Sequence, residues 1–476
     1  MQTRSYIKQL FSESLIYGLS RVAIKLVNIF IVPLYTRFFS PEEYGLLGLI
    51  TNGIFLFTIL LILGMDSATA VFFWAKEDKV EQKKTISTWF WIQTVTSVIV
   101  LPIIILSSGW LENILHQQEG VSFYFILGGL ILFFSLPSEI LMNWLRLQRK
   151  PKELFLYSVS ISILLISLNL FFIVKMNFGF KGILYSQVIT AVIGTLATVI
   201  AMRDWLSLKY FSAEYFKKMF RFSSPLIPAA IASWLITSSA VYFINHFLDS
   251  SQAGIYQVGS ILASGMGMLI LAFQMAWGPF ALSIQRKEGA KKIYALVLQL
   301  YTCISVLLAV FLFFFSKEIL MIFTTEKYYA ADLVAGILGF NIIIGGFTYI
   351  ASIGLNIVKS SVPYSAITIF GSLVTLLLFF LLIKPLGKEG AALASLCGQI
   401  IVPVYLFFAA QKRYPVPYNF SLAIAMFITG ILFAAASFYF KDFLNGYFKI
   451  ILFAVLIILF AVINRNLLYA LQAGRQ

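Results

Sequence analysis

The sequence predicts an all-α integral membrane protein with about fourteen transmembrane helices. Of its 476 residues, 60% are hydrophobic and 12% are charged, and the mean hydropathy is +0.91. These values lie far outside the range of soluble domains. Apolar segments of about 20 residues also recur from one end of the chain to the other, and each is long enough to cross a hydrocarbon core about 30 Å thick.

The predicted spans follow one another with short connections. In chain order they are residues 15–39, 44–65, 85–108, 121–146, 153–175, 179–202, 222–246, 253–280, 291–315, 332–358, 363–383, 388–410, 420–440 and 447–467. The first span is too long and too charged to be the apolar region of a cleavable signal peptide, so we expect it to act as a signal anchor.

The basic residues are distributed unevenly between the predicted loops. The net charge of +15 comes from 35 Lys and Arg against 20 Asp and Glu, and most of the basic residues fall in alternate loops. Basic loops of a membrane protein face the cytoplasm. The pattern therefore predicts that both termini are cytoplasmic, and it accounts for the net charge without a nucleic-acid partner.

A weak internal repeat divides the chain. Residues Phe39–Leu46 match Leu248–Ile255 at an offset of about 209 residues, which places Gly45 on Gly254. Residues Phe180–Ser186 match Lys388–Ala394 at an offset of about 208, which places Gly182 on Gly390. Both matches lie where a predicted span begins, as a repeat of whole helices requires.

The repeat predicts two six-helix lobes and an additional helix pair. We expect the N-terminal lobe at residues 1–210, the C-terminal lobe at 211–412, and the extra pair at 413–476. Six spans per repeat is an even number, so both lobes have the same orientation and are related by an axis along the membrane normal. This arrangement favours alternating access, in which two lobes rock about a central cavity.

Two cations lie inside the first predicted span. Arg21 and Lys25 share one helical stripe with Asn28. A cation at the centre of a lipid-facing helix costs roughly 2.5 to 3.5 kcal/mol, so the pair is expected to face protein, water or an anion. We interpret the stripe as an anion site; the alternative is that both side chains reach back to the membrane surface.

The matching stripe of the second repeat is aromatic. At the offset of 209, Arg21 maps onto Ala230 and Lys25 onto Trp234, with Tyr242 two turns further on. A cavity with one cationic wall and one aromatic wall suits a molecule that has both phosphate and sugar groups. Trp234 and Tyr242 are therefore candidate sugar contacts, although aromatic residues in a span also serve simply for packing.

Glu139 is a carboxylate well inside a predicted span. One interpretation is a site that takes up H⁺ or Na⁺ and couples transport to an ion gradient. The other is a structural ion pair with Arg21, Lys25 or Arg146. The residue types alone leave both open.

The sequence offers no signature of an enzyme, a metal site or a cofactor site. The two cysteines, Cys303 and Cys397, lie in separate predicted spans, and His116 and His246 are isolated. No glycine-rich phosphate loop ending in Lys-Ser or Lys-Thr is present, so we expect no ATP hydrolysis. No loop is long enough for a catalytic domain.

Three short motifs resemble one family of transporters. Residues Pro33–Gly45, Gly64–Ala68 and Gln274–Phe280 are similar to bacterial polysaccharide biosynthesis transporters, the Wzx-type oligosaccharide flippases of the multidrug/oligosaccharidyl-lipid/polysaccharide exporter superfamily. The resemblance implies two six-helix bundles around a cavity in the bacterial cytoplasmic membrane. It also implies movement of an undecaprenyl-pyrophosphate-linked oligosaccharide, with Arg21 and Lys25 as candidate pyrophosphate ligands.

Other functions remain as alternatives. A multidrug-extrusion exporter would share the fold, but a cationic cavity wall would repel cationic drugs. A membrane polymerase or ligase of glycan assembly would need an acid or base on the outer face, where Glu112, His116 and Glu119 are scattered in one loop. A scaffold for other assembly proteins would not require Arg21 and Lys25.

Overall fold

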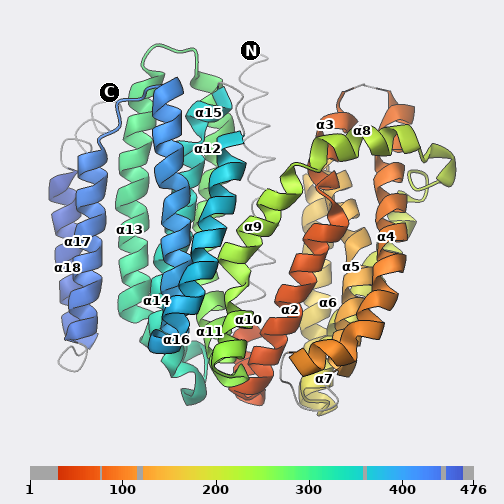
Figure 1. The fold of residues 1–476 in the computed structure, drawn as a ribbon, viewed down its shortest axis with the longest axis horizontal. Helices are drawn as coiled ribbons and strands as arrows, with labels where there is room; N and C mark the ends of the chain where they lie inside the picture. Colours follow the sequence, from red (N-terminus) through yellow and green to blue (C-terminus); the bar gives the residue numbers. More distant parts are fainter. Residues whose placement is uncertain (1–30, 76–77, 115–121, 358–361, 441–445, 465–476) are drawn as a thin grey trace. The chain divides into compact units, whose positions relative to one another are not determined.

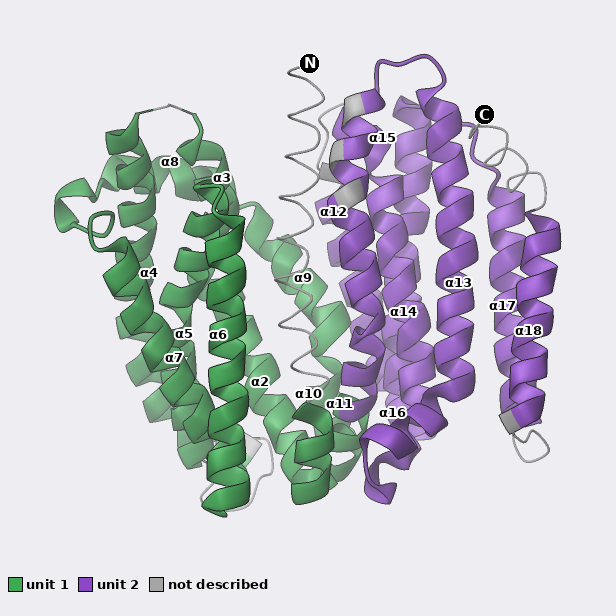
Figure 2. Cartoon of the chain, turned by 180° about the vertical axis from the view of Figure 1, so that it is seen from behind, with its two compact units in different colours: residues 1–257 green, residues 258–476 purple. Residues whose placement is uncertain are grey.

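The computed structural model describes residues 31–464 apart from 76–77, 115–121, 358–361 and 441–445, and every regular element in this part of the chain is a helix (Figure 1). The chain forms two compact units, Met1–Gln257 and Val258–Gln476 (Figure 2). The prediction of lobes at 1–210 and 211–412 rests on the sequence repeat rather than on contacts, and it stays a prediction.

The first unit contains the end of the first predicted span, helical from residue 31 to 38, and the elements that follow it. These elements are α2 (Pro41–Ile62), α3 (Met65–Phe73), α4 (Lys79–Ile114), α5 (Ser122–Leu147), α6 (Pro151–Asn169), the π-helix η1 (Leu170–Lys175), α7 (Phe180–Met202), the 3₁₀ helix η2 (Leu208–Tyr210), α8 (Ala213–Ser223), α9 (Leu226–Ser238), α10 (Ala240–Phe247) and α11 (Ser250–Ser264), whose second half crosses into the second unit.

The second unit continues with longer helices. Its elements are α12 (Met266–Ile284), α13 (Ala290–Phe323), the 3₁₀ helix η3 (Glu326–Ala331), α14 (Asp332–Ala351), α15 (Ile353–Ile357), α16 (Val362–Arg413), α17 (Phe420–Tyr439) and α18 (Gly446–Ile463).

The described helices bear out a polytopic membrane protein. Nine of them are long and apolar enough to cross a membrane, or up to eleven when each of two bent pairs is counted as one span. The count of fourteen stays a prediction, because most of the first span lies outside the described residues. The helix α16 is interrupted at Gly387, between the predicted spans 363–383 and 388–410.

Several spans are broken where the hydropathy is continuous. The predicted span 222–246 is divided. The helices α8 and α9 meet at an angle of 50°, and Ser239 separates the end of α9 at Ser238 from the start of α10 at Ala240. Pro225, which lies between α8 and α9, has no N–H for a helical hydrogen bond. After α2, Leu63 and Gly64 both take the left-handed conformation, and α3 starts as a separate helix.

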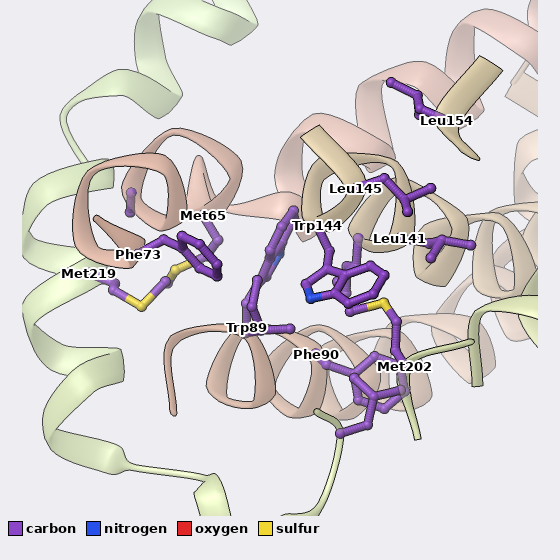
Figure 3. Packing of buried hydrophobic residues seen from close by; sticks show 14 residues of the cluster. Met65, Phe73, Trp89, Phe90, Leu141, Trp144, Leu145, Leu154, Met202 and Met219 are labelled. Atoms are coloured by element: carbon purple, nitrogen blue, oxygen red, sulfur yellow. The ribbon is translucent and has the colours of Figure 1, made fainter. Parts of the chain in front are cut away.

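The core of the first unit is rich in aromatic and sulfur-containing side chains. Trp89, Trp144 and Phe73 are buried with Met65 and Met219 between α3, α4, α5 and α8 (Figure 3). Large aromatic rings bury much apolar area per residue. This cluster holds α8 against the other helices of the unit.

The last helix, α18, is attached to α13 near both of its ends. Near its start, Lys449 Nζ lies 2.7 Å from Glu318 Oε1 and 3.0 Å from the Phe314 carbonyl oxygen. Just after its end, Asn464 Oδ1 accepts a hydrogen bond of 2.8 Å from Gln299. The predicted extra helix pair is thus joined to α13 by specific polar contacts as well as by apolar packing.

Helix starts at matched repeat positions have the same local structure. The Ser40 hydroxyl accepts a hydrogen bond from the Glu43 N–H at 3.3 Å, and Asp249 Oδ1 accepts one from the Gln252 N–H at 2.7 Å. Positions 40 and 43 correspond to 249 and 252 at the offset of 209. Side-chain acceptors at this position satisfy N–H groups that have no partner in the first helical turn.

A second pair of helix starts also matches. Gly179 precedes α7 with φ 55° and ψ −141°, and Gly387 interrupts α16 with φ 64° and ψ −147°. Only glycine adopts this region readily. Both glycines lie at the same offset of 208 that relates Gly182 to Gly390.

Candidate functional site

The cations that carry the main sequence prediction, Arg21 and Lys25, lie outside the described residues, as does Asn28. Their role stays a prediction. The structure does place the other candidates, Glu139, Trp234 and Tyr242, all of which belong to the first unit.

Glu139 lies on a polar stripe of α5. The Asn143 side chain donates to the Glu139 carbonyl oxygen at 3.0 Å, and the Arg146 guanidinium donates to Asn143 Oδ1 at 2.5 Å. Glu139, Asn143 and Arg146 are spaced by four and three residues, so they share one helix face. The carboxylate is half-buried, and both the ion-coupling and the ion-pair roles stay predictions.

Hydroxyl groups gather next to Glu139, where α5, α6 and α7 meet. A Cβ atom on Gly194 would lie 2.6 Å from Ser138 Oγ and 3.1 Å from the Tyr157 hydroxyl. The missing side chain at Gly194 therefore leaves room for polar groups around the helix that carries the carboxylate.

The two aromatic candidates attach α9 and α10 to α2. Trp234 Nε1 donates to the Asn52 carbonyl oxygen at 3.1 Å, and the Tyr242 hydroxyl donates to the Leu49 carbonyl oxygen at 2.6 Å. Their ring centroids are 5.9 Å apart. Each donor is thus used on the backbone of α2, and Trp234 is only 7% exposed.

These rings border a cavity of about 320 Å³ in the first unit. The other walls come from α2, α4 and α5 and include Gly53, Ile104 and Phe125. The lining is almost wholly apolar, so this cavity suits hydrocarbon or the face of a ring better than a charged group.

An amide pair beside the aromatic residues was not predicted from the sequence. Asn52 Nδ2 donates to Gln257 Oε1 at 3.3 Å and to the Gly48 carbonyl oxygen at 2.8 Å. Both amides are half-buried. Each was visible in the sequence as an uncharged polar residue inside a predicted span, but no spacing pattern linked one to the other.

The second unit contains a much larger apolar groove of about 1030 Å³. It is formed by α13, α14, α16 and α17, with Phe340, Phe407 and Phe427 among its walls. Of the described residues that line it, Gln411 alone has a polar side chain. A groove of this kind accommodates a hydrocarbon chain.

Among the described residues, no group of three or more His, Cys, Asp or Glu side chains is placed so that it could hold a metal ion. The arrangement provides apolar cavities, aromatic faces and hydrogen-bonding groups. These groups can bind and orient an amphiphilic molecule.

The arrangement of helices is similar to that in several solved membrane transporters. An inward-facing multidrug resistance MATE family transporter of the MOP superfamily aligns with a TM-score of 0.64 and 17% identity over 85% of this chain and 97% of that one. Lipid II flippase MurJ in an inward closed conformation aligns with a TM-score of 0.69 and 18% identity over 96% and 100%. A mutant of the Vibrio cholerae MATE transporter VcmN aligns with 0.55 and 18% over 86% and 97%.

This protein therefore has the fold of the MOP superfamily transporters. It belongs to the polysaccharide biosynthesis protein family, which matches residues 34–332, well over half of the chain. Comparison with curated proteins finds no match. The family assignment confirms the resemblance carried by residues Pro33–Gly45 and Gln274–Phe280.

Proposed function

We propose that this protein is a flippase that moves an undecaprenyl-pyrophosphate-linked oligosaccharide across the bacterial cytoplasmic membrane by alternating access. The oligosaccharide would be a repeat unit of O-antigen, capsule or exopolysaccharide. The apolar groove of about 1030 Å³ carries this proposal, since a lipid-linked substrate needs a place for its hydrocarbon chain and a soluble substrate does not. The family and the similarity in fold to a lipid II flippase support it.

The groove orients the lipid rather than providing affinity. Hydrocarbon tails of the bilayer are as apolar as the groove, so a prenyl chain gains little hydrophobic free energy by entering it. Affinity must come from the headgroup. A unit charge about 4 Å from a phosphate gains roughly 4 kcal/mol at an effective dielectric constant near 20, and Arg21 and Lys25, with Asn28, are the proposed pyrophosphate ligands.

The remaining candidates complete the proposal. The faces of Trp234 and Tyr242 would contact sugar rings, and Glu139 would take up H⁺ or Na⁺ and couple transport to an ion gradient. Arg21 would form the stronger contact, because its planar fork matches two phosphate oxygens and Lys25 acts as a point charge.

Filling the groove tests the proposal. Ala435 is exposed and lines the groove, and Ala425 is exposed on the same helix but does not line it. We expect Ala435→Trp to reduce complementation of a flippase-null strain at normal expression, and Ala425→Trp to leave it unchanged. Equal activity of both variants would contradict the role of the groove.

The headgroup site has a separate test. Arg21→Ala and Lys25→Ala should each reduce complementation without loss of protein from the membrane, and Arg21→Lys should recover only part of it. Full activity of the double alanine variant would contradict the anion site.

A multidrug exporter is the second candidate, because a MATE family transporter shares the fold. Drug efflux that persists in Ala435→Trp and in the double alanine variant would favour it. Loss of glycan assembly in those variants, with unchanged drug sensitivity, favours the flippase.

A further inference from the structure

A small cavity with four polar side chains among its lining residues lies where α4, α5 and α7 meet in the first unit. Its volume is about 110 Å³, and its walls include Gln93, Ser97, Pro137 and Thr195. The proposed function does not use this cavity, and a role for the cavity does not depend on that function.

Gln93 is the most unusual residue in its wall. The side chain is only 2% exposed, and within the described residues neither its amide nitrogen nor its amide oxygen has a hydrogen-bond partner. Burial of an unpaired amide in an apolar environment is costly. The cavity beside the amide is therefore expected to hold its partner.

A second polar group comes from the turn of α5 that precedes Pro137. Pro137 has no N–H, so it cannot donate to the carbonyl oxygen of Phe133 four residues earlier. The next carbonyl oxygen, that of Phe134, accepts a hydrogen bond of 2.5 Å from the Thr195 hydroxyl of α7. Phe133 and Phe134 both line the cavity, so the weakened turn of α5 faces it.

The remaining hydroxyls present acceptors to the cavity. Ser97 donates to the Gln93 carbonyl oxygen at 2.7 Å, and Thr94 donates to that of Phe90 at 2.8 Å. Their protons are used within α4, which leaves oxygen lone pairs for an occupant. The occupant must thus donate several hydrogen bonds and also accept from the Gln93 amide.

The lining contains no carboxylate, which argues against a bare cation in this part of the membrane. The volume has room for about three to four water molecules at roughly 30 Å³ each. Water donates two hydrogen bonds and accepts two. It therefore meets the needs of both the amide and the carbonyl groups.

We propose that the Gln93 cavity is a hydration site whose bound water molecules connect the Gln93 amide to the backbone of α5 beside Pro137. Water can exchange partners as a helix bends, so it keeps backbone groups paired where proline has removed a donor. The site therefore sets how easily α5 bends two residues before Glu139.

Hydroxyl-radical footprinting of the full-length protein in lipid nanodiscs tests this, because water activated in place labels nearby rings. We expect labelling of Phe90, Phe133 and Phe134 in the wild type and its loss in Gln93→Leu. A high-resolution map of the wild type should show ordered water bonded to the Gln93 amide. Gln299→Leu, an amide change on α13, is the matched control and should leave the labelling unchanged.

Proline variants separate the effect of the missing N–H in α5 from the effect of the Gln93 amide. Pro137→Ala restores the missing N–H and should lower the labelling, whereas Pro102→Ala, in α4 and outside the cavity, should not. If Gln93→Leu does not fold, Gln93→Met and the wild-type map decide the question. Equal labelling in the wild type and Gln93→Leu, a dry cavity in the map, or labelling that changes when choline replaces Na⁺ would overturn the proposal.

Discussion

The helices α2 and α11 begin in the same way and then differ. Both are capped at matched positions, by Ser40 and by Asp249, and Gly45 and Gly254 meet at their crossing. A Cβ atom on Gly45 would overlap the carbonyl oxygen of Ser250, and one on Gly254 would overlap that of Pro41. At the offset of 209, Pro41 corresponds to Ser250, so the contact is reciprocal, as expected for repeats related by a two-fold axis.

The difference appears one turn further along. Position 48 is glycine in α2, whereas its counterpart in α11 is Gln257. A Cβ on Gly48 would lie 3.2 Å from Gln257 Cγ, so the amide occupies space that the glycine leaves open, and it reaches Asn52. The junctions of the repeat thus keep their structure, while each copy has one amide where the other copy has an apolar residue: Gln257 corresponds to Gly48, and Asn52 corresponds to Ile261.

The largest loss of stability is expected where α2 and α11 cross, at Gly45 and Gly254. In Gly45→Ala or Gly254→Ala, the new methyl group would meet backbone atoms, which cannot move aside as a side chain can. Overpacking of this kind costs about 1 to 3 kcal/mol, occasionally more. Thermal unfolding in detergent should show both variants clearly destabilised.

Gly109→Ala is the control for the crossing, because a Cβ there meets nothing within 4 Å. It should be neutral or slightly stabilising. If alanine at Gly45 or at Gly254 left the unfolding temperature unchanged, the close contact between α2 and α11 would be contradicted.

The second largest loss of stability is expected at Gly179 and Gly387, the matched glycines at the second pair of helix starts. Gly179→Ala and Gly387→Ala should each cost about 1 to 3 kcal/mol, because alanine is strained at these backbone angles. The two losses, measured as shifts in thermal unfolding, should be similar. Gly278→Ala, with no atom within 4 Å of the added carbon, is the control, and a loss at only one junction would show that the match is accidental.

Hydropathy predicted the long helices and not their interruptions. The spans 153–175 and 179–202 correspond closely to the helices from Pro151 to Lys175 and from Phe180 to Met202, since continuous apolar runs of this length have one stable form in lipid. The break at Ser239 was missed because the short polar run Thr237–Ser239 lies inside a longer apolar segment. The π-helix Leu170–Lys175 was missed because all of its residues except Lys175 are apolar.

The sequence allowed the candidate residues to be chosen by their type, but it did not indicate which groups they would contact. Glu139 and Trp234 could be selected because polar and aromatic residues in a span require an explanation. The hydrogen bond from Trp234 to the Asn52 carbonyl oxygen joins positions 182 residues apart and ends on backbone. Such a bond leaves no mark in the sequence of either helix, and the same holds for the cavity between Gln93 and Pro137.

The third effect concerns the helix caps. Ser40→Ala and Asp249→Ala should each cost about 1 kcal/mol, because each leaves an N–H of the first turn without its acceptor. The exchange Ser40→Asp with Asp249→Ser should cost only a few tenths, since both residue types are good caps. Thermal unfolding of the three variants measures this, and a large loss on exchange would mean that the two caps are not equivalent.

The smallest expected change in stability concerns position 48 of α2, which is glycine where α11 has Gln257. Gly48→Ala should cost about 0.5 kcal/mol in the wild type, because the methyl group approaches a flexible side chain that can shift. In a Gln257→Ala background the space is open, so the same change should be neutral or slightly stabilising. The resulting coupling would be at the low end of the values of about 0.5 to 3 kcal/mol found for residues in contact. A double-mutant cycle of thermal unfolding measures it, and additive effects would show that Gln257 does not depend on the glycine opposite.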